Sequence, residues 1–463
     1  MVVAYSDYRV SDTAWAARIP AHWRTARLRY VARVCNGTTP SRDRFDYWSN
    51  GTVPWLASGQ VNDYIVRKAR ELVTLPAVKE SSLRVLPAGS VILGMVGQGK
   101  TRGMSAYLAI DATINQNLAG ITPAKELDGR YLHYMLIAAY DFQRNYGRGG
   151  NQAALNCAIV GSFPTLLPPR PEQDQIVAYL RAQDAHIARF IKAKRELIKL
   201  LTEQKLRIID HAVTRGLDPS VKLKPSGIEW LGEVPVHWEL RRLKFLASNT
   251  TNQTTTKASD EIYLAMEHVQ SWTGVARPLE GEVEFASTVK RFVADDVLFG
   301  KLRPYLAKVT RAKCNGVCVS EFLVLRSRKE IILPAYLEQL LRCKRAIDLI
   351  NSSTAGAKMP RADWTFIGNV RLPIPCKDEQ EAILDYIEIE TKDLDAAIAR
   401  TEEEIKLIRE YRDRLIADVV TGQVDVRGWQ PGPEDVVDDA ALAALGDDQD
   451  DVSDEENGYG EEN

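Results

Sequence analysis

The clearest pattern of apolar positions is a seam that occurs twice along the chain. The first seam alternates spacings of four and three residues through Ile187, Ile191, Lys194, Ile198, Leu201, Lys205, Ile208 and Ala212. The second lies 207 positions later, at Leu394, Ile398, Thr401, Ile405, Ile408, Arg412, Leu415 and Val419. This spacing is typical of a coiled coil. Each seam therefore predicts a helix of roughly 40 residues, about 60 Å long.

The two predicted helices carry matching signals at their ends. They begin at Pro171-Glu172-Gln173 and at Asp378-Glu379-Gln380, where acidic residues favour the positive end of the helix dipole. Gly216 and Gly422 are the predicted stops. Since a lone helix of this kind buries nothing, the two seams most simply pack on each other.

The rest of the chain is also a repeat. Pro20-Ala21-His22-Trp23 recurs as Pro235-Val236-His237-Trp238, and 172–218 aligns without a gap on 379–425 with 15 identities in 47 positions. Strand-like runs at 90–93 and 118–122 have counterparts at 297–299 and 317–325, separated by prolines and glycines. Each half is thus predicted to be a compact α+β domain followed by a long helix.

These patterns predict two similar globular domains, joined by two long coiled-coil helices in a pseudo-twofold repeat. The predicted boundaries are 1–168 for the first domain, 169–215 for the first helix, 216–234 for a linker, 235–376 for the second domain, 377–422 for the second helix and 423–463 for an acidic, disordered tail.

Composition limits the class of protein. Apolar residues make up 45% and charged residues 26% of the 463 positions, as in ordinary globular proteins. No run of 18 apolar residues occurs, and Asp7, Arg9 and Asp12 stand where a signal peptide would be apolar. The six cysteines lack paired spacing, which argues against a disulfide framework or a metal site and indicates the cytoplasm.

Charge is placed unevenly. Residues 428–463 hold 13 Asp and Glu and no Lys or Arg, so the remaining chain has 60 basic and 62 − 13 = 49 acidic residues, a net charge of +11. That sign is expected of a surface that meets phosphates. The tail has two interpretations: a solvated, disordered segment, or an intramolecular competitor for a DNA surface.

Several motifs together resemble one family. These are Leu167-Pro168-Pro169 with Pro171-Glu172-Gln173 before a long helix, Val213-Thr214-Arg215-Gly216-Leu217-Asp218, Ser226-Gly227-Ile228-Glu229-Trp230-Leu231-Gly232, Phe299-Gly300-Lys301-Leu302-Arg303-Pro304-Tyr305-Leu306 and Val319-Ser320-Glu321-Phe322. In this order they resemble the DNA specificity subunit of type I restriction-modification systems, over roughly residues 15–427.

The resemblance implies two target-recognition domains, each reading one half of a bipartite, asymmetric DNA site, with two antiparallel helices as a spacer. It also implies double-stranded DNA, two methyltransferase subunits and restriction subunits as partners. S-adenosylmethionine, ATP and magnesium would be bound by those partners and none by this chain, which would not be an enzyme. A split site is also what two similar, non-identical basic domains would suit.

One motif points elsewhere. Gly94-Met95-Val96-Gly97-Gln98-Gly99-Lys100-Thr101 matches the P-loop pattern of nucleotide-binding proteins. A P-loop needs a helix to begin at the Lys-Thr, and Gly103 followed by turn and strand residues disfavours one. A glycine-rich loop that approaches the DNA backbone, or a plain surface hairpin, remains the alternative.

Candidate DNA-contacting residues are basic, amide and aromatic side chains in loops, each of which singly could be a solvated surface residue. They are Arg42, Arg44, Tyr47, Trp48, Ser58, Gln60, Asn62, Lys100, Arg102, Arg148, Asn151 and Gln152 in the first domain, and Lys290, Arg291, Lys301, Arg303, Lys308 and Arg361 in the second. His22 and His237 repeat beside tryptophans, which favours packing over catalysis.

Two other functions stay open from the residues alone. A coiled-coil assembly scaffold would use the repeated domains to bind proteins without reading DNA. An ATPase would rest on the P-loop match alone.

Overall fold

A computed structural model describes residues 4–97, 100–146, 154–279, 288–354 and 359–437, together with Leu442, Leu445 and Gly446. It divides into two compact units. Unit 1 comprises Met1–Glu196 with Glu402–Asn463, and unit 2 comprises Leu197–Thr401. Because the boundary crosses both long helices, each unit contains one globular domain and a stretch of each helix.

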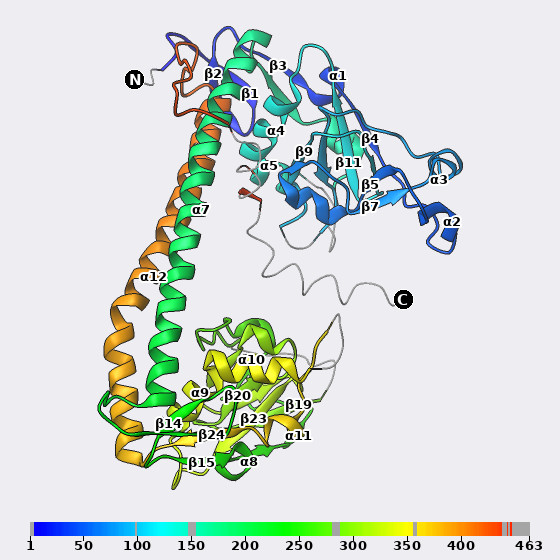
Figure 1. The fold of residues 1–463 in the computed structure, drawn as a ribbon. Helices are drawn as coiled ribbons and strands as arrows, with labels where there is room; N and C mark the ends of the chain where they lie inside the picture. Colours follow the sequence, from blue (N-terminus) through cyan, green and yellow to red (C-terminus); the bar gives the residue numbers. More distant parts are fainter. Residues whose placement is uncertain are drawn as a thin grey trace. The chain divides into compact units, whose positions relative to one another are not determined.

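The two long helices are α7, Arg170–Arg215, and α12, Lys377–Val420 (Figure 1). Their bounds agree with the predicted 169–215 and 377–422 to within two residues. In unit 1, Asp184 pairs with Arg412 and Lys194 with Glu404, so positions that rise along α7 fall along α12. The two stretches are therefore antiparallel in this unit. In unit 2, Lys205 of α7 pairs with Asp395 of α12.

The seam residues lie in the interior of the helix pairs. Ile187, Ile191 and Ile405 are buried, and Ile198, Leu201, Ile208, Leu394, Ile398, Ile408 and Leu415 are half-buried. Three of the four polar seam positions form ion pairs between the helices: Lys194 with Glu404, Lys205 with Asp395, and Arg412 with Asp184. The fourth, Thr401, donates to the Ala397 carbonyl.

The globular part of unit 1 is built from short elements. Its strands are β1 Tyr8–Thr13, β2 Ala16–Pro20, β3 Arg24–Arg27, β4 Ala32–Asn36, β5 Val53–Leu56, β6 Ile65–Val66, β7 Glu71–Val73, β8 Val91–Gly94, β9 Ser105–Leu108, β10 Thr113–Ile114, β11 Leu118–Pro123 and β12 Pro164–Leu167. Its short helices are α1 Leu28–Val31, α2 Phe45–Trp48, η1 Ser58–Asp63, α3 Leu75–Glu80, α4 Gly129–Ala138, α5 Tyr140–Asn145 and α6 Cys157–Gly161.

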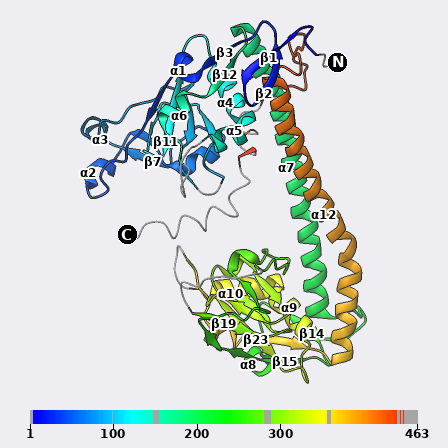
Figure 2. The same cartoon turned by 180° about the vertical axis from the view of Figure 1, so that it is seen from behind.

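Two sheets organise the described part of unit 1. The larger has the order β4-β11-β8-β9-β6, and the smaller has the order β10-β5-β7, with β10 parallel to β5. Helix α4 buries one face, including Tyr131 and Leu132, in a core that also holds Ile176 and Leu180 of α7. In both views β1 and β2 lie beside the first turns of α7 (Figures 1 and 2).

Unit 2 follows the same plan. Its strands are β13 Leu223–Pro225, β14 Glu233–Pro235, β15 Glu239–Arg242, β16 Ala247–Thr250, β17 Gln253–Thr254, β18 Ile262–Leu264, β19 Val289–Phe292, β20 Val297–Gly300, β21 Val309–Arg311, β22 Gly316–Cys318, β23 Phe322–Ser327 and β24 Arg371–Ile374. Its short helices are α8 Leu243–Leu246, η2 Met266–His268, η3 Pro304–Leu306, α9 Pro334–Arg342, α10 Lys344–Ser352 and α11 Trp364–Ile367.

The main sheets of the two units correspond in part. In the described part of unit 2 the two four-stranded sheets have the orders β16-β23-β20-β21 and β17-β19-β22-β18. Strands β16, β23, β20 and β21 take the places of β4, β11, β8 and β9, and the parallel pair β22–β18 takes the place of β10–β5. Both predicted α+β domains are thus present, as copies of one fold.

Three expectations need correction. The run 317–325 is two strands in different sheets, because the chain turns between them, where the Phe322 amide donates to the Val319 carbonyl. The 216–234 linker contains an antiparallel strand pair, β13 with β14. The tail does not begin at 423, since Val426 is buried and packs in the core of unit 1. Beyond residue 437 the tail lies outside the described residues, apart from Leu442, Leu445 and Gly446.

Candidate nucleic-acid interface

Each globular domain is fixed to a helix start by the same contacts, here called the Trp–Glu latch. In unit 1, Glu172 of α7 accepts from Trp23 Nε1 at 2.9 Å and contacts His22 Nε2 at 2.9 Å. In unit 2, Glu379 of α12 accepts from Trp238 Nε1 at 3.0 Å and contacts His237 Nε2 at 2.9 Å. Both histidines thus have the structural role expected of them.

The latch also explains the glycines at the helix ends. Gly422 has a φ of +72°, and a Cβ there would lie 2.3 Å from Pro20 Cδ. Gly216 has a φ of +76°, and its Cβ would lie 3.2 Å from the Trp238 ring. The Pro-x-His-Trp segment in each unit therefore packs on the end of one long helix and bonds to the start of the other. Sequence analysis assigned Glu172 and Glu379 to the helix dipole and missed this contact.

The glutamine after each latch glutamate holds a loop of its own unit. Gln173 accepts from the Asp128 amide at 2.8 Å, next to the start of α4, and donates to the Glu126 and Pro168 carbonyls. Gln380 accepts from the Leu333 amide at 2.9 Å, next to the start of α9, and donates to the Ile331 and Pro375 carbonyls. The repeated Glu-Gln pairs thus position equivalent parts of both domains.

Around α2 the basic candidates are already paired. Arg42 bonds to Glu71 and stacks 3.8 Å from the centre of the Trp48 ring. Arg44 bonds to Asp46 at 2.9 and 2.7 Å. Both guanidinium groups are exposed, but a phosphate would have to compete with a carboxylate. Tyr47 is buried and donates to Glu80, so it is a packing residue and not a base reader.

The turn η1 contains three more candidates. Gln60 is 1% exposed, and its amide bonds to Asp63, the Lys68 carbonyl and the Arg70 amide. Because all its polar atoms are used inside the domain, the expectation that Gln60 reads a base is wrong. Ser58 is half-buried. Asn62 is half-buried beside the cavity described below.

The P-loop-like segment does not lead into a helix. After β8, the amide of Gly103 returns to the Gly94 carbonyl at 2.9 Å, and β9 pairs antiparallel with β8. Lys100 and Thr101 are therefore followed by a strand, and the helix N-terminus that would face nucleotide phosphates is replaced by a hairpin. Lys100 is exposed and Arg102 is half-buried. Arg148, Asn151 and Gln152, like Gln98 of this segment, lie outside the described residues.

Two candidates in unit 2 have structural partners. Lys290 is buried, and its Nζ donates to the Ser320 and Phe322 carbonyls at 3.0 and 2.7 Å, so it does not face a ligand. Burial, followed by the charge of Lys301, lowers the pKa of Lys290. Arg291 is half-buried, and its Nε donates to Glu261 at 2.7 Å.

The remaining candidates of unit 2 meet around one loop. The loop 301–308 follows β20 and is joined to residues 360–362, because the Arg303 amide donates to the Pro360 carbonyl and the Ala362 amide donates to the Lys301 carbonyl. Arg361 lies 3.1 Å from Glu321 Oε1, and Lys308 Nζ donates to the Met266 carbonyl at 2.8 Å. Residues 60 positions apart in sequence, Lys301 and Arg361, thus share one surface.

This loop has a constrained backbone. Arg303 has a φ of 50° and Ala307 a φ of 47°, the left-handed conformation that non-glycine residues rarely adopt. They flank the single turn of η3, which begins at Pro304. The backbone hydrogen bonds to residues 360–362 hold the loop in this conformation.

The loops after β8 and β20 share one electrostatic feature. Within the described residues, Lys100 of the first loop and Lys301 and Arg303 of the second have no carboxylate within ion-pair distance. The other basic candidates with charged partners, Arg42, Arg44, Arg291 and Arg361, lie in ion pairs. Cations without a carboxylate partner, on corresponding loops of two repeated domains, are suited to bind phosphate groups.

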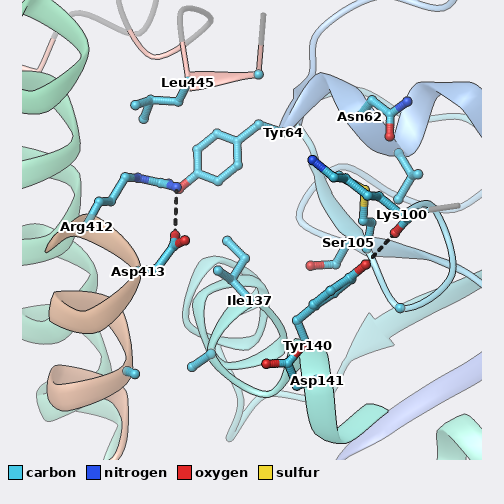
Figure 3. A pocket seen from close by; sticks show the side chains of 16 residues that line it. Asn62, Tyr64, Lys100, Ser105, Ile137, Tyr140, Asp141, Arg412, Asp413 and Leu445 are labelled. Carbon is cyan, nitrogen blue, oxygen red and sulfur yellow. Dashed lines mark hydrogen bonds and ion pairs between the residues drawn. The ribbon is translucent and has the colours of Figure 1, made fainter. Parts of the chain in front are cut away.

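Lys100 also lies at a cavity of about 490 Å³ in unit 1. In Figure 3 the Tyr140 hydroxyl points to the Lys100 carbonyl, to which it donates at 2.7 Å, and Tyr64, Ile137 and Arg412 form the opposite side. At that side Asp184 binds Arg412 and accepts from the Tyr64 and Tyr134 hydroxyls. Burial alone would lower the pKa of Arg412, but Asp184, Tyr64 and Tyr134 together more than offset it and raise the pKa of Arg412.

The described part of the chain holds no candidate metal site, membrane-spanning helix or disulfide bond. No group of three or more His, Cys, Asp or Glu side chains there could hold a metal ion. No helix in that part is both long and apolar enough for a membrane span. All six cysteines are free thiols.

Comparison with known proteins agrees with this geometry. Residues 20–200 match the family model of the type I restriction modification DNA specificity domain. This part of the chain is similar to that family. The match begins at the Pro-x-His-Trp segment and ends in α7, so it covers the globular domain of unit 1 from β3 onward together with the glutamate of its latch.

Individual relatives extend the likeness. The chain is 27% identical over 211 residues to the specificity subunit of the type I restriction enzymes EcoR124I and EcoR124II of Escherichia coli, covering 45% of this chain and 46% of that protein. It is 26% identical over 235 residues to the MjaIX specificity subunit of Methanocaldococcus jannaschii, covering 49% and 52%. The alignments thus span about half the length of these relatives.

One solved structure shares the fold. A chain from a structure described as "Structural basis underlying complex assembly and conformational transition of the type I R-M system" superposes with a TM-score of 0.55 at 14% sequence identity. The superposition covers 87% of this chain and 98% of that one. The α+β domains and long helices predicted from the sequence are therefore an established fold.

Proposed function

We propose that this chain is the DNA specificity subunit of a type I restriction-modification complex. The observation that carries the proposal is the repeat itself. Two domains of one fold, each fixed by a Trp–Glu latch, present cations without carboxylate partners on the loops after β8 and β20. The two domains share one fold but differ in the sequence of these loops. A protein that reads two different halves of one asymmetric DNA site requires this combination.

The chain itself does no chemistry in this proposal. Its partners are double-stranded DNA, two methyltransferase subunits and restriction subunits, and the complex works in the cytoplasm. S-adenosylmethionine, ATP and magnesium belong to those partners. Exposed apolar side chains on the long helices, among them Leu200 at 53% and Ile389 at 71%, support docking of protein subunits there.

The helices are proposed to set the spacing between the half-sites. Inserting four residues after Lys199, matched by four after Lys406, adds about 6 Å to each helix. At about 3.4 Å per base pair, the preferred gap should change by one or two base pairs, with both half-sites unchanged. An unchanged gap in an insertion variant that still methylates DNA would assign the spacing to the methyltransferase subunits.

Salt dependence separates this function from that of a protein scaffold. The chain should be co-expressed with its methyltransferase subunit and its affinity for a duplex measured between 50 and 200 mM salt. If several phosphates are contacted, the affinity falls by orders of magnitude across this range. A complex that assembles normally but binds DNA weakly at every salt concentration would favour a coiled-coil scaffold.

A further inference from the structure

The residues that follow α12 stay in contact with unit 1. The Trp429 ring packs edge-on against Tyr179 of α7, with ring centres 5.4 Å apart. Gln175 of α7 donates its side-chain amide to the Trp429 carbonyl. The segment that follows α12 is therefore laid back along the first half of α7.

A second group of contacts holds the next residues. Arg189 of α7 donates to the Glu434 and Val436 carbonyls at 3.0 and 3.2 Å, and also to His186 Nδ1 at 2.9 Å. His186 Nδ1 is thereby an acceptor, so its Nε2 carries the proton and donates to Asp435 at 2.8 Å. Both the backbone and an acidic side chain of this segment are recognised by α7.

Further along, the segment reaches the domain itself. Leu442 is 1% exposed and lines a small cavity together with Tyr64, Tyr107, His133 and Tyr134. Leu445 and Gly446 line the cavity of Figure 3 together with Asn62 and Lys100. A Cβ on Gly446 would lie 3.0 Å from the Asn62 carbonyl. An anchored leucine thus brings the chain to two of the candidate DNA-contacting residues.

The sequence beyond this point is acidic. Gly446 is followed by Asp447 and Asp448, and 428–463 contains 13 acidic residues and no basic one. Gly446, the residue before this acidic stretch, lines the same cavity as Lys100, which has no ion-pair partner among the described residues.

We propose that the C-terminal segment 428–463 is an intramolecular ligand of unit 1 that competes with DNA. Trp429, Asp435 and Leu442 dock it, and its negative charge competes with DNA phosphates for the positive charge of unit 1. The proposal rests on the proposed DNA-binding function. It makes the affinity of unit 1 for DNA depend on release of the segment.

The test uses the full chain in complex with its methyltransferase subunit. Three variants are compared with it: a chain that stops after Arg427, Leu442→Ser, and Val436→Ser. The last is a matched control, since Val436 is 65% exposed and its loss leaves the docking contacts in place. The measured quantity is the dissociation constant for a random-sequence duplex at several salt concentrations.

The truncated chain and Leu442→Ser should bind DNA several-fold more tightly than the full chain at low salt, and Val436→Ser should bind like it. A synthetic peptide of residues 428–463 should restore the weaker binding when added to the truncated complex, and a Leu442→Ser peptide should restore it less. Equal affinities for all four proteins would overturn this proposal and leave the proposed function standing. No DNA binding by any of them would overturn both.

Discussion

The buried ion pair of Asp184 and Arg412 gives the sharpest test of how unit 1 is held together. The two side chains are 2% and 11% exposed, with Arg412 Nε 2.6 Å from Asp184 Oδ1. Asp184 Oδ2 also accepts from the Tyr64 and Tyr134 hydroxyls at 2.6 and 2.8 Å. One carboxylate thus joins α7 to α12, to α4 and to the turn before β6.

Replacing Asp184 by Ala leaves a guanidinium and two hydroxyls buried without their acceptor. Breaking a buried pair costs about 3–5 kcal/mol, and each orphaned hydroxyl adds about 1–3 kcal/mol. The neighbouring cavity of about 490 Å³ gives water a route to some of these groups. We therefore expect Asp184→Ala to destabilise unit 1 by about 4 kcal/mol.

Arg412→Met should cost about 3 kcal/mol, because it leaves the carboxylate buried with only two hydroxyl donors. The double variant Asp184→Ala, Arg412→Met removes both charges and should cost only about 2–3 kcal/mol. The difference from the sum of the single changes is a coupling of about 4–5 kcal/mol. The pair is thus predicted to specify the helix register more than it stabilises the fold.

Unfolding should be followed in urea by hydrogen exchange of peptides from α4 and α7 of unit 1, since a chain of two units need not unfold in one step. The control is Lys205→Met, whose ion pair with Asp395 in unit 2 is 19% and 52% exposed and should contribute less than about 1 kcal/mol. Additive single effects, or an effect of Asp184→Ala no larger than that of the control, would refute the reasoning.

Three further predictions concern other parts of the molecule. Glu172→Ala should destabilise unit 1 by about 2–4 kcal/mol, and Glu379→Ala should destabilise unit 2 by less, because Glu172 is 6% and Glu379 25% exposed. Hydrogen exchange of each unit measures both effects, and an equal loss of stability in the two units would show that the latch geometry is wrong. His133 is buried and its pKa is lowered to about 3, mainly by burial. Unfolding of the protein should therefore take up a proton between pH 6.5 and 3, so the free energy of unfolding of unit 1 should fall by about 1.4 kcal/mol per pH unit as the pH decreases through this range. His133→Gln should flatten this pH profile, whereas a variant of the exposed His211 should not. An unchanged slope in His133→Gln would contradict this prediction. Lys301→Ala and Arg303→Ala should each reduce the slope of log affinity for DNA against log salt concentration by about 1. Arg44→Ala should change this slope less, because Arg44 is paired with Asp46. A larger change in Arg44→Ala would show that the absence of an ion pair does not identify the residues that contact DNA.

The helices and the repeat could be predicted because each rests on local information. A four-and-three spacing maintained over eight positions, ended by glycines with φ near +75°, leaves few alternatives to a long helix. The run 317–325 was harder, since a continuous apolar stretch does not show that the chain turns at Ser320-Glu321 and continues in another sheet. Hydrophobicity reports burial, and the turn is set by tertiary hydrogen bonds.

The candidate site was less predictable. Residue type suggested Gln60 and Lys290 as DNA contacts, but both are buried and bonded to backbone carbonyls of their own domains. Arg42 is paired with Glu71, 29 residues away, which no local pattern indicates. The latch could have been predicted from the sequence, because Glu172 and Glu379 recur in the repeat just as the two His-Trp pairs do. Their role required knowing that the helix starts lie beside those pairs.

The most direct test of the central claim is a map of adenine methylation in the genome of the source cell, with this gene intact, deleted, and carrying a related globular domain in place of residues 20–165. The intact gene should give a bipartite motif that disappears on deletion. The exchanged domain should change one half of that motif and leave the other half as it was. A motif that survives deletion, or an exchange that changes both halves, would contradict the account.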